Sequence, residues 1–397
     1  MRTLLTTLGI VIGISTVIMV LSAGAGFRSL INDEIKSLGS DTLFIKTRIP
    51  PTTKNRAANS LTPGITVGIT TFKQRDLDDI KKLNNVVNDY GMVTGMAIAS
   101  YRDNTKSLIY FGSSAARFSI DQHTLKEGRF YTAAEDAGAA QVVILGSNVA
   151  TNLFVQDNPL GKLLRVGNLN FQVIGVYNSQ GSVGGSGADD SVYMPLGTAQ
   201  KKMLGIDYIT VGVVQLKDIN LADATAALIS STLMHNHNIT DPEKDDFIVM
   251  TQAQVLDIYN TIFNGITILL IAIASISLIV GGVGIMNIMY VVVTERTSEI
   301  GLKKALGATN SDILKEFLIE SVLVTVLGGI IGILLGAVLS WLISDIANAN
   351  GLTWIFTVPI YAIVIAVSVS AAIGISFGVL PARSAAKLDP VEALRYE

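Results

Sequence analysis

Four apolar segments dominate this sequence, and each is long enough to span a lipid bilayer. The hydrocarbon core of a bilayer requires about 20 predominantly apolar residues in a helix. The segments that meet this length are Leu4–Ala23, Ile262–Val293, Phe317–Ile343 and Val358–Leu380. Only 15% of the 397 residues are charged, whereas soluble proteins have about 25%. We therefore expect an integral membrane α-helical protein with four transmembrane helices and a large domain between the first two.

The basic residues beside the spans predict the orientation of the chain. They follow the second and the fourth span, at Arg296, Lys303, Lys304, Lys315, Arg383, Lys387 and Arg395. The short loop Ser344–Thr357, between the third and fourth spans, contains no Lys or Arg. Cytoplasmic loops carry the excess of basic residues. Both chain ends and the 294–316 loop are therefore expected in the cytoplasm, with the large domain on the outer side of the cell membrane.

The start of the sequence has a second interpretation. Met-Arg, an apolar run and the small residues SAGAG are similar to a secretory signal peptide with a cleavage site. The single Arg and the length of the apolar run favour a retained transmembrane helix instead.

The residue inventory argues against several classes of site. The chain has no cysteine, which excludes disulfides, thiolate zinc sites and cysteine nucleophiles. The net charge of −3 gives no indication of a nucleic-acid partner. GSVGGSGADD and PLGKLL both lack the GxxxxGK[ST] pattern of a phosphate-binding loop. His235 and His237 could ligate a metal from one face of a strand, but two histidines alone are a weak signal. We predict no catalytic site and no metal site.

The segment between the first two spans has the pattern of a mixed α and β domain. TTFKQRDLDDIKKL predicts a helix with Thr71 as its N-cap. The runs VVILG, LLRVG, NFQVIGVY and SVYMPL predict a β-rich part within Phe118–Leu204. Strands are predicted on either side of it at Val86–Ser100, Ser107–Gly112, Tyr208–Leu216 and Asp246–Met250, with a helix at Leu221–Leu233. We therefore expect one α/β domain whose two halves flank a β-rich insert.

Glycines recur at four-residue spacing in three of the four spans. Helices in lipid gain no hydrophobic energy when they meet, so small residues that allow close backbone approach promote their association. We predict close helix packing, within or between subunits, at these positions and at a glycine pair in the second span: Gly9, Gly13, Gly281, Gly282, Gly328, Gly332, Gly336, Gly374 and Gly378. Glu316 and Glu320 lie at the cytoplasmic entrance of a span, which argues against ion-coupled transport.

A strongly polar segment, Thr294–Ile313, joins the second and third spans. Glu299 and Lys303 are spaced as a favourable i, i+4 pair, and Gly307 is placed as a helix C′ residue. T-N-S-D, which begins at Thr309, resembles a capping box at the start of the next helix. The segment therefore predicts a short cytoplasmic helix, a stop and a restart. An amphipathic connector resting on lipid is the alternative, but it does not explain the specified turn residues.

This region resembles the hallmark segment of the MacB/FtsX-type ABC transporter permeases. The resemblance rests on GGVGIMNIMYVVVTERTSEIGLKKALGATNSDILKEFLIESVLVTVLGGIIGILLG. It extends in family order to LKEGRFYTAAED, VVILGSNVATNLF, NPLGKLLRVGNLNFQVIGV, SVYMPLGTAQKKMLG and LPARSAAKLDPVEALRYE, so it covers essentially the whole chain. The sequence is similar to the MacB-type, or type VII, transmembrane subunit.

The resemblance implies a large extracytoplasmic α+β domain, with a porter-like α/β part and an inserted β-rich sabre-like part. The implied order is transmembrane helix 1 (1–24), a stalk (25–38), the first half of the porter-like part (39–115), the sabre-like insert (116–205), the second half of the porter-like part (206–250), a stalk with transmembrane helix 2 (251–293), a coupling helix (294–313), transmembrane helix 3 (314–344), a short extracytoplasmic loop (345–357), transmembrane helix 4 (358–380) and a cytoplasmic tail (381–397).

By resemblance, the chain is the permease subunit of an exporter of drugs, peptides or envelope substrates and has no ATPase site or cofactor of its own. A partner ABC ATPase would bind ATP and Mg²⁺, and its dimerisation would be relayed through the stalks to the outer domain, which is called mechanotransmission. The other implied partners are a second permease copy, a membrane-fusion adaptor and the lipid membrane. The residues implied to face the ATPase are Glu295, Arg296, Glu299, Ile300, Lys303, Lys304, Gly307 and Ala308.

Two other functions stay open on this resemblance, a lipoprotein-releasing subunit and an FtsX-like regulator of cell-wall hydrolases. The overall length and the two-part outer domain favour the exporter. The sequence departs from the family pattern at Met1, which begins almost inside the first span, where members usually have a preceding amphipathic helix. The true start lies upstream, the gene is truncated, or that helix is dispensable. The loop Gly181–Asp190 is also richer in glycine than the family pattern.

Overall fold

The computed structural model of this chain describes residues 2–37, 39, 41–50, 69–155, 157–179, 187–349 and 354–394. The chain divides into two units. One, the helical unit, comprises Met1–Leu30, Tyr259–Ala349 and Trp354–Glu397, and the other, the sheet unit, comprises Ile31–Ile258 and Asn350–Thr353. Along the chain, two of the boundaries between them fall within helices α1 (Arg2–Ser37) and α8 (Gln252–Glu295).

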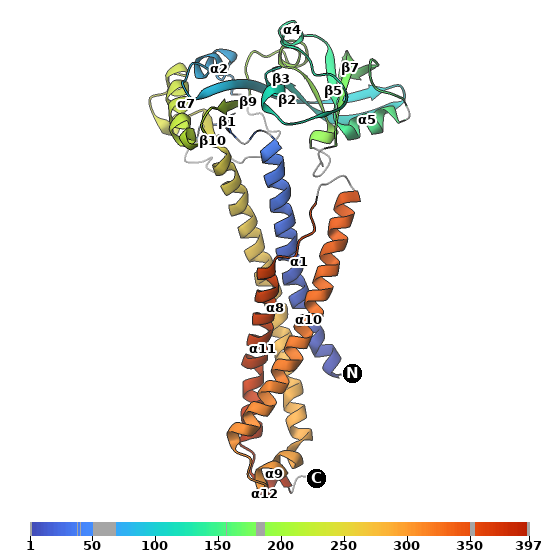
Figure 1. The fold of residues 1–397 in the computed structure, drawn as a ribbon, viewed down its shortest axis with the longest axis vertical. Coiled ribbons are helices and arrows are strands. Elements are labelled where there is room, and N and C mark those ends of the chain that lie inside the picture. Colours follow the sequence, from blue (N-terminus) through green and yellow to red (C-terminus); the bar gives the residue numbers. More distant parts are fainter. Residues whose placement is uncertain are drawn as a thin grey trace. The chain divides into compact units, whose positions relative to one another are not determined.

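Four helices among the described residues are long and apolar enough to cross a membrane, as the sequence predicted. They are α1, α8, α10 (Asn310–Ala349) and α11 (Ile360–Ala386). In the most apolar 18-residue stretch of α1, 56% of the residues are buried, whereas 22–28% are buried in the corresponding stretches of the other three helices. α1 is therefore the most enclosed of these helices. The two short helices α9 (Thr297–Ala305) and α12 (Pro390–Leu394) lie together at one end of the bundle (Figure 1).

α1 meets α8 and α10 at glycines. A Cβ added to Gly9 would lie 2.8 Å from the Cα of Gly281 on α8. One added to Gly336 would lie 2.8 Å from the carbonyl oxygen of Ser15 on α1, and the hydroxyl of Ser15 donates to the carbonyl of Gly332 over 2.9 Å. These backbones approach so closely that no side chain fits between them.

α10 and α11 are packed in the same way. The Ser321 hydroxyl donates to the Gly374 carbonyl over 3.0 Å, and a Cβ on Gly374 would lie 2.9 Å from the Cα of Val322. The remaining predicted packing glycines are all buried: Gly378 faces Ser321, Gly13 faces Leu278 of α8, Gly282 faces Phe377 of α11, and Gly328 lies within α10.

The described part of the sheet unit is built on a ten-stranded sheet, ordered β10-β1-β9-β2-β3-β8-β5-β7-β4, with β6 paired to β2 and β7. The strands are β1 (Thr42–Thr47), β2 (Val86–Tyr101), β3 (Asn104–Ser113), β4 (Leu125–Gly128), β5 (Val142–Leu145), β6 (Leu163–Val166), β7 (Leu169–Tyr177), β8 (Ser191–Pro195), β9 (Val211–Leu216) and β10 (Phe247–Thr251). The strands predicted from alternating and short apolar runs are confirmed, and β1 and β4 are additional.

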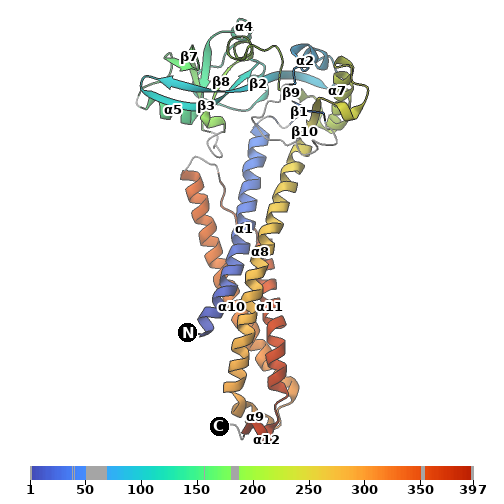
Figure 2. The ribbon, with the colours of Figure 1, turned by 180° about the vertical axis from the view of Figure 1, so that it is seen from behind.

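Helices of this unit cover part of the sheet. They are α2 (Gln74–Ile80), α3 (Arg117–Ile120), α4 (Ala133–Ala137), α5 (Ser147–Phe154), α6 (Leu196–Thr198) and α7 (Ala222–Asn236). α2 and α7 lie side by side (Figure 2), where Leu77 and Ile229 are buried with Ile45 of β1 in one core. The predicted N-cap of α2 is wrong. Lys73 is the cap residue, and its backbone amide donates to the Asp76 carboxylate over 2.8 Å. The Thr71 hydroxyl does not cap the helix, because it donates to Asp246 over 2.5 Å.

The sheet is continuous through the segment predicted as a β-rich insert. β8 pairs in parallel with β3, from Ile109↔Ser191 to Ser113↔Pro195. β6 pairs with the far end of β2 at Ala99↔Val166. Strands predicted to flank the insert and strands predicted within it therefore share one hydrogen-bonded sheet. The boundaries of the porter-like and sabre-like parts stay a prediction.

Candidate functional site

The link between α8 and α10 is a short helix bounded by specific turn residues. α8 ends at Glu295 and α9 runs from Thr297 to Ala305. Gly307 then adopts φ +102°, a conformation that residues with a Cβ rarely adopt. The Thr309 amide donates to the Asp312 carboxylate over 3.0 Å, and the Asp312 amide donates to the Thr309 hydroxyl over 3.3 Å. The predicted helix, stop and capped restart are confirmed.

Two ion pairs join α9 and the residue before it to α10. Arg296 Nη1 lies 3.2 Å from Glu320 Oε2, and Lys303 Nζ lies 2.5 Å from Glu316 Oε1. The predicted Glu299–Lys303 pair is therefore wrong, since Lys303 is paired across to α10. The Oε2 atom of Glu299 lies 4.0 Å from Nε of Arg296 instead. The two glutamates at the start of the third span thus serve as partners for the basic residues of the turn.

The chain segment after α11 holds the other side of α9. Lys304 Nζ donates to the carbonyl oxygens of Ala386 and Leu388 over 2.9 and 2.6 Å. A Cβ on the buried Gly301 would lie 2.8 Å from the Cβ of Ala393 in α12. α12 was not predicted from the sequence, although the pattern D-P-V-E-A-L, which begins at Asp389, has a Pro at the first helical position.

The predicted ATPase-facing residues fall into three groups by exposure. Ile300 is only 2% exposed and belongs to the same core as Ile313 and Phe317, so it does not lie on the surface. Lys304 and Ala308 are half-buried. The exposed ones are Glu295, Arg296, Glu299, Lys303 and Gly307.

One side of α9 is exposed and partly apolar. Leu302 is 54% exposed and Leu306 is 82% exposed. Together with Glu299 they recur at three- and four-residue spacing, which places them on one face of α9 and its C-cap residue. We call these three residues the outer face of α9. A cavity of about 340 Å³ lies on the opposite side of α9, where it is lined by Tyr290, Thr297, Leu388, Glu392 and Ala393, among others. An exposed apolar face is a suitable surface for a protein partner.

At the other end of the helical unit, α1 and α8 are joined by side chains. The rings of Phe27 and Phe263 have centroids 4.3 Å apart, and Arg28 Nη2 donates to Asn264 Oδ1 over 2.5 Å. The Ser22 hydroxyl also donates to the Thr357 carbonyl over 2.6 Å. The predicted stalks begin at these contacts.

The two histidines considered for a metal lie at the end of α7 and not on a strand. His237 is buried, with Nδ1 2.8 Å from Asp246 Oδ1 and Nε2 3.5 Å from Asp76 Oδ2, whereas His235 is exposed. Burial opposes charge on the imidazole, but the hydrogen bonds that the ring donates to the two carboxylates outweigh it and raise the pKa of His237 to about 9. Within the described ranges, no group of three potential ligands could hold a metal ion. Residues 181–186 of the glycine-rich loop lie outside them.

Similarity to known proteins covers nearly the whole chain. Residues 3–232 match the MacB-like periplasmic core domain family, and residues 271–390 match the FtsX-like permease C-terminal family. The chain is 34% identical over 401 residues to the macrolide export ATP-binding/permease protein MacB of Bdellovibrio bacteriovorus and 37% identical over 400 residues to that of Marinobacter nauticus. Both alignments cover 100% of this chain but only 59% and 58% of the relatives.

A solved structure, the periplasmic region of MacB from Actinobacillus actinomycetemcomitans, is similar to 57% of this chain and 95% of its own, with 21% identity and a TM-score of 0.46.

Proposed function

This chain belongs to the MacB-like periplasmic core domain family, and we propose that it is the permease subunit of an ABC exporter. In this proposal, an ATPase outside these 397 residues binds ATP and Mg²⁺, and the chain converts ATP hydrolysis into movement of its extracytoplasmic domain. The observation that carries the proposal is the geometry of α9: its outer face is exposed, and its other sides are fastened to α10 and to the segment after α11.

The contacts of α9 with its neighbours would allow this short helix to transmit force. α9 follows α8 after a single residue, contacts α10 through Lys303, and holds the end of α11 through Lys304. Exposed ion pairs contribute only about 0.2–1 kcal/mol each. The pairs of Lys303 and Arg296 alone would therefore connect α9 to α10 only weakly. The hydrogen bonds of Lys304 and the close packing at Gly301 are less exposed. A push on the outer face therefore acts on three membrane helices at once.

The orientation and partners follow from the same proposal. The basic residues of the turn support a cytoplasmic location for α9 and both chain ends, where the ATPase would bind, and an outer location for the sheet unit. A second permease copy and a membrane-fusion adaptor complete the proposed assembly. The names of the relatives describe macrolide export, which supports a drug, a peptide or another envelope substrate as the cargo.

The outer face of α9 can be tested by co-purification of the cognate ATPase from membranes. Leu306→Glu replaces an exposed apolar side chain with a charge that the interface would have to desolvate. We expect retention of the ATPase to fall at least about tenfold, because burying one leucine contributes roughly 1.5–3 kcal/mol. Leu306→Met keeps an apolar side chain and is expected to retain the ATPase. Full retention by Leu306→Glu would show that this face does not bind the ATPase.

A further inference from the structure

One face of the sheet carries a row of apolar side chains. Phe44 of β1 is paired with Val213 of β9, and Val213 is paired with Tyr90 of β2. Directly paired residues point to the same face of a sheet. The next paired residues on this face, two positions along, are Val211 and Met92. The opposite face is the one covered by α2, because a Cβ on Gly212 would lie 3.2 Å from the side chain of Leu77 in α2.

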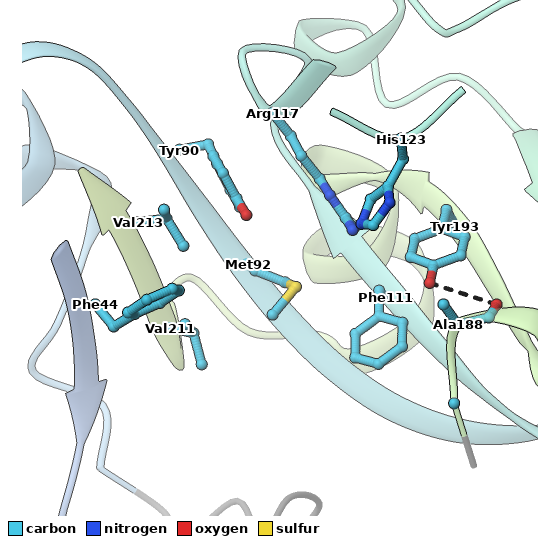
Figure 3. Close-up of a pocket in the computed structure, with 11 residues that line it drawn as sticks. Phe44, Tyr90, Met92, Phe111, Arg117, His123, Ala188, Tyr193, Val211 and Val213 are labelled. Carbon is cyan, nitrogen blue, oxygen red and sulfur yellow. Dashed lines mark hydrogen bonds between the residues drawn. The ribbon is translucent and has the colours of Figure 1, made fainter. Parts of the chain in front are cut away.

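The row continues on the next two strands and lines a cavity that is partly open to solvent. Phe111 of β3 is paired with Tyr193 of β8, and their rings stack with centroids 5.4 Å apart. A cavity of about 360 Å³ is lined by these side chains and by Arg117 and His123. Figure 3 shows Arg117 and His123 projecting towards Met92, Phe111 and Tyr193. This volume lies in the lower part of the range of small-molecule sites, about 300–1,000 Å³.

Arg117 brings a charged group into this apolar space. The residue is only 5% exposed. Its Nε lies 2.5 Å from Asp121 Oδ2, and the Tyr90 hydroxyl donates to the other oxygen of the same carboxylate over 3.0 Å. The guanidinium carbon lies 4.7 Å from the centre of the Tyr193 ring. Among the described residues, Nη1 of Arg117 is buried and has no hydrogen-bond partner.

A buried guanidinium N–H without an acceptor is costly, and native proteins normally satisfy such a group. An ordered water is the simplest acceptor. The cavity, however, is about ten times the roughly 30 Å³ that one water occupies in the liquid, and most of its wall is apolar. The remaining water in this partly open pocket would lie against apolar walls, from which an apolar molecule displaces it favourably. A larger molecule with one polar atom fits both features.

The charges around the cavity limit the kind of polar atom. Asp121 already neutralises the Arg117 guanidinium, so the pair offers a directed donor without net positive charge. Burial, with a contribution from Arg117, lowers the pKa of His123 to about 4, so its imidazole is neutral at physiological pH. A carboxylate would therefore lose its hydration without gaining a net counter-charge.

We propose that this cavity binds a neutral, mainly apolar or aromatic small molecule whose carbonyl or ether oxygen accepts a hydrogen bond from Arg117 Nη1. The site lies entirely within the sheet unit. It does not depend on the coupling role proposed for α9, because binding can be measured without ATP and without an ATPase.

The absence of cysteine from the chain gives a direct assay of occupancy. Met92→Cys places one thiol in the cavity wall, and Ser231→Cys places one on the exposed side of α7 as a matched control. The rate at which each thiol reacts with a water-soluble methanethiosulfonate is measured on the full chain in lipid discs, with and without 2-acetylnaphthalene. We expect this ketone to slow the reaction at least about fivefold for Met92→Cys and to leave that of Ser231→Cys unchanged. Equal rates with and without the ketone for Met92→Cys would overturn the proposal.

Two further probes test the hydrogen bond. 2-Ethylnaphthalene has the same ring system without an acceptor, and 2-naphthoate replaces the ketone with a carboxylate. Each is expected to need a roughly tenfold higher concentration than the ketone for the same protection. 2-Ethylnaphthalene lacks the hydrogen bond to a charged group, which typically contributes about one order of magnitude in affinity. 2-Naphthoate can accept this bond but loses the hydration of its charge without gaining a net counter-charge. Equal protection by all three compounds would show an apolar cavity without a role for Arg117.

A paired substitution removes the donor while keeping the site neutral. In the Met92→Cys background, Arg117→Met with Asp121→Asn should abolish the preference for the ketone over 2-ethylnaphthalene. A retained preference in the folded variant would exclude Arg117 as the donor. If this variant does not fold, the comparison of the three probes on the Met92→Cys chain still decides the matter.

Discussion

The buried contact between His237 and two carboxylates gives a pH-dependent stability whose size can be worked out from the structure. Burial alone would raise the pKa values of Asp76 and Asp246, but the hydrogen bonds from His237 and other neighbours lower both below their ordinary values. The same contact raises the pKa of His237 from 6.5 to about 9. The charged triad therefore ties α2 to the end of α7 and to the residue before β10.

The sign of the effect follows from the direction of the shift. A group with a raised pKa in the folded state stabilises that state fully below its unfolded pKa, and this stabilisation is lost as the pH rises through the folded pKa. For His237 the window runs from about pH 6.5 to about pH 9. Each pKa unit corresponds to about 1.4 kcal/mol, so the free energy of unfolding of this region should fall by about 3 kcal/mol across the window.

Hydrogen exchange with mass spectrometry on the full chain measures this local stability. After correction for the intrinsic exchange rate, peptides of α2 and of the end of α7 should open more easily at pH 9.5 than at pH 6.5. His237→Gln should remove this dependence and cost about 3 kcal/mol at pH 6.5, because it leaves two buried carboxylates without their shared partner. His235→Gln, at the exposed histidine two residues earlier, should behave as the unchanged chain. Protection that is constant from pH 6.5 to 9.5 in the unchanged chain would refute the reasoning.

Three further outcomes are expected. Gly336→Ala should lower the stability of the membrane helices by about 1–3 kcal/mol in thermal unfolding, because its Cβ would press on the α1 backbone; Gly265→Ala, which has open space around it, should be neutral or stabilising. Lys304→Met should increase hydrogen exchange in 388–394, whereas Lys303→Met should not, since Lys304 donates to the carbonyls of this segment and Lys303 is paired with α10; equal exchange in both would contradict the described contacts. A Glu299→Cys thiol should react with a membrane-impermeant maleimide only when the inner face of the membrane is accessible, and labelling from outside intact cells would invert the proposed topology.

Local patterns predicted much of this molecule, because the interactions behind them span few residues. Gly307 and the Thr309–Asp312 capping box act within one turn, and apolar runs of the right length indicate membrane helices without knowledge of their neighbours. The partner of Lys303 was mispredicted for the opposite reason. Glu316 is brought near it only by the return of α10, and an i, i+4 rule cannot anticipate that contact.

Contacts across long stretches of sequence were beyond prediction. His237 lies 161 residues from Asp76, so the pattern H-x-H gave no indication that carboxylates surround one of its imidazoles. The cavity beside Arg117 is lined by residues of five neighbouring strands of the sheet. The sequence of a single strand does not indicate which strands will lie beside it. The packing of α12 against α9 depends on Gly301, which has no side chain to block the contact. The importance of this glycine can be seen only when the position of α12 is known.

β2 has 16 residues, which corresponds to roughly 50 Å of extended strand. It pairs with β9 near one end and with β6 near the other, and β3 runs beside much of its length. Because β2 is hydrogen-bonded to strands along most of its length, it can bend or twist gradually. A sharp hinge within it would break hydrogen bonds to these neighbouring strands. The sheet unit should therefore move as one rigid body, so that a small tilt at the β10 edge becomes a larger displacement at the far edge.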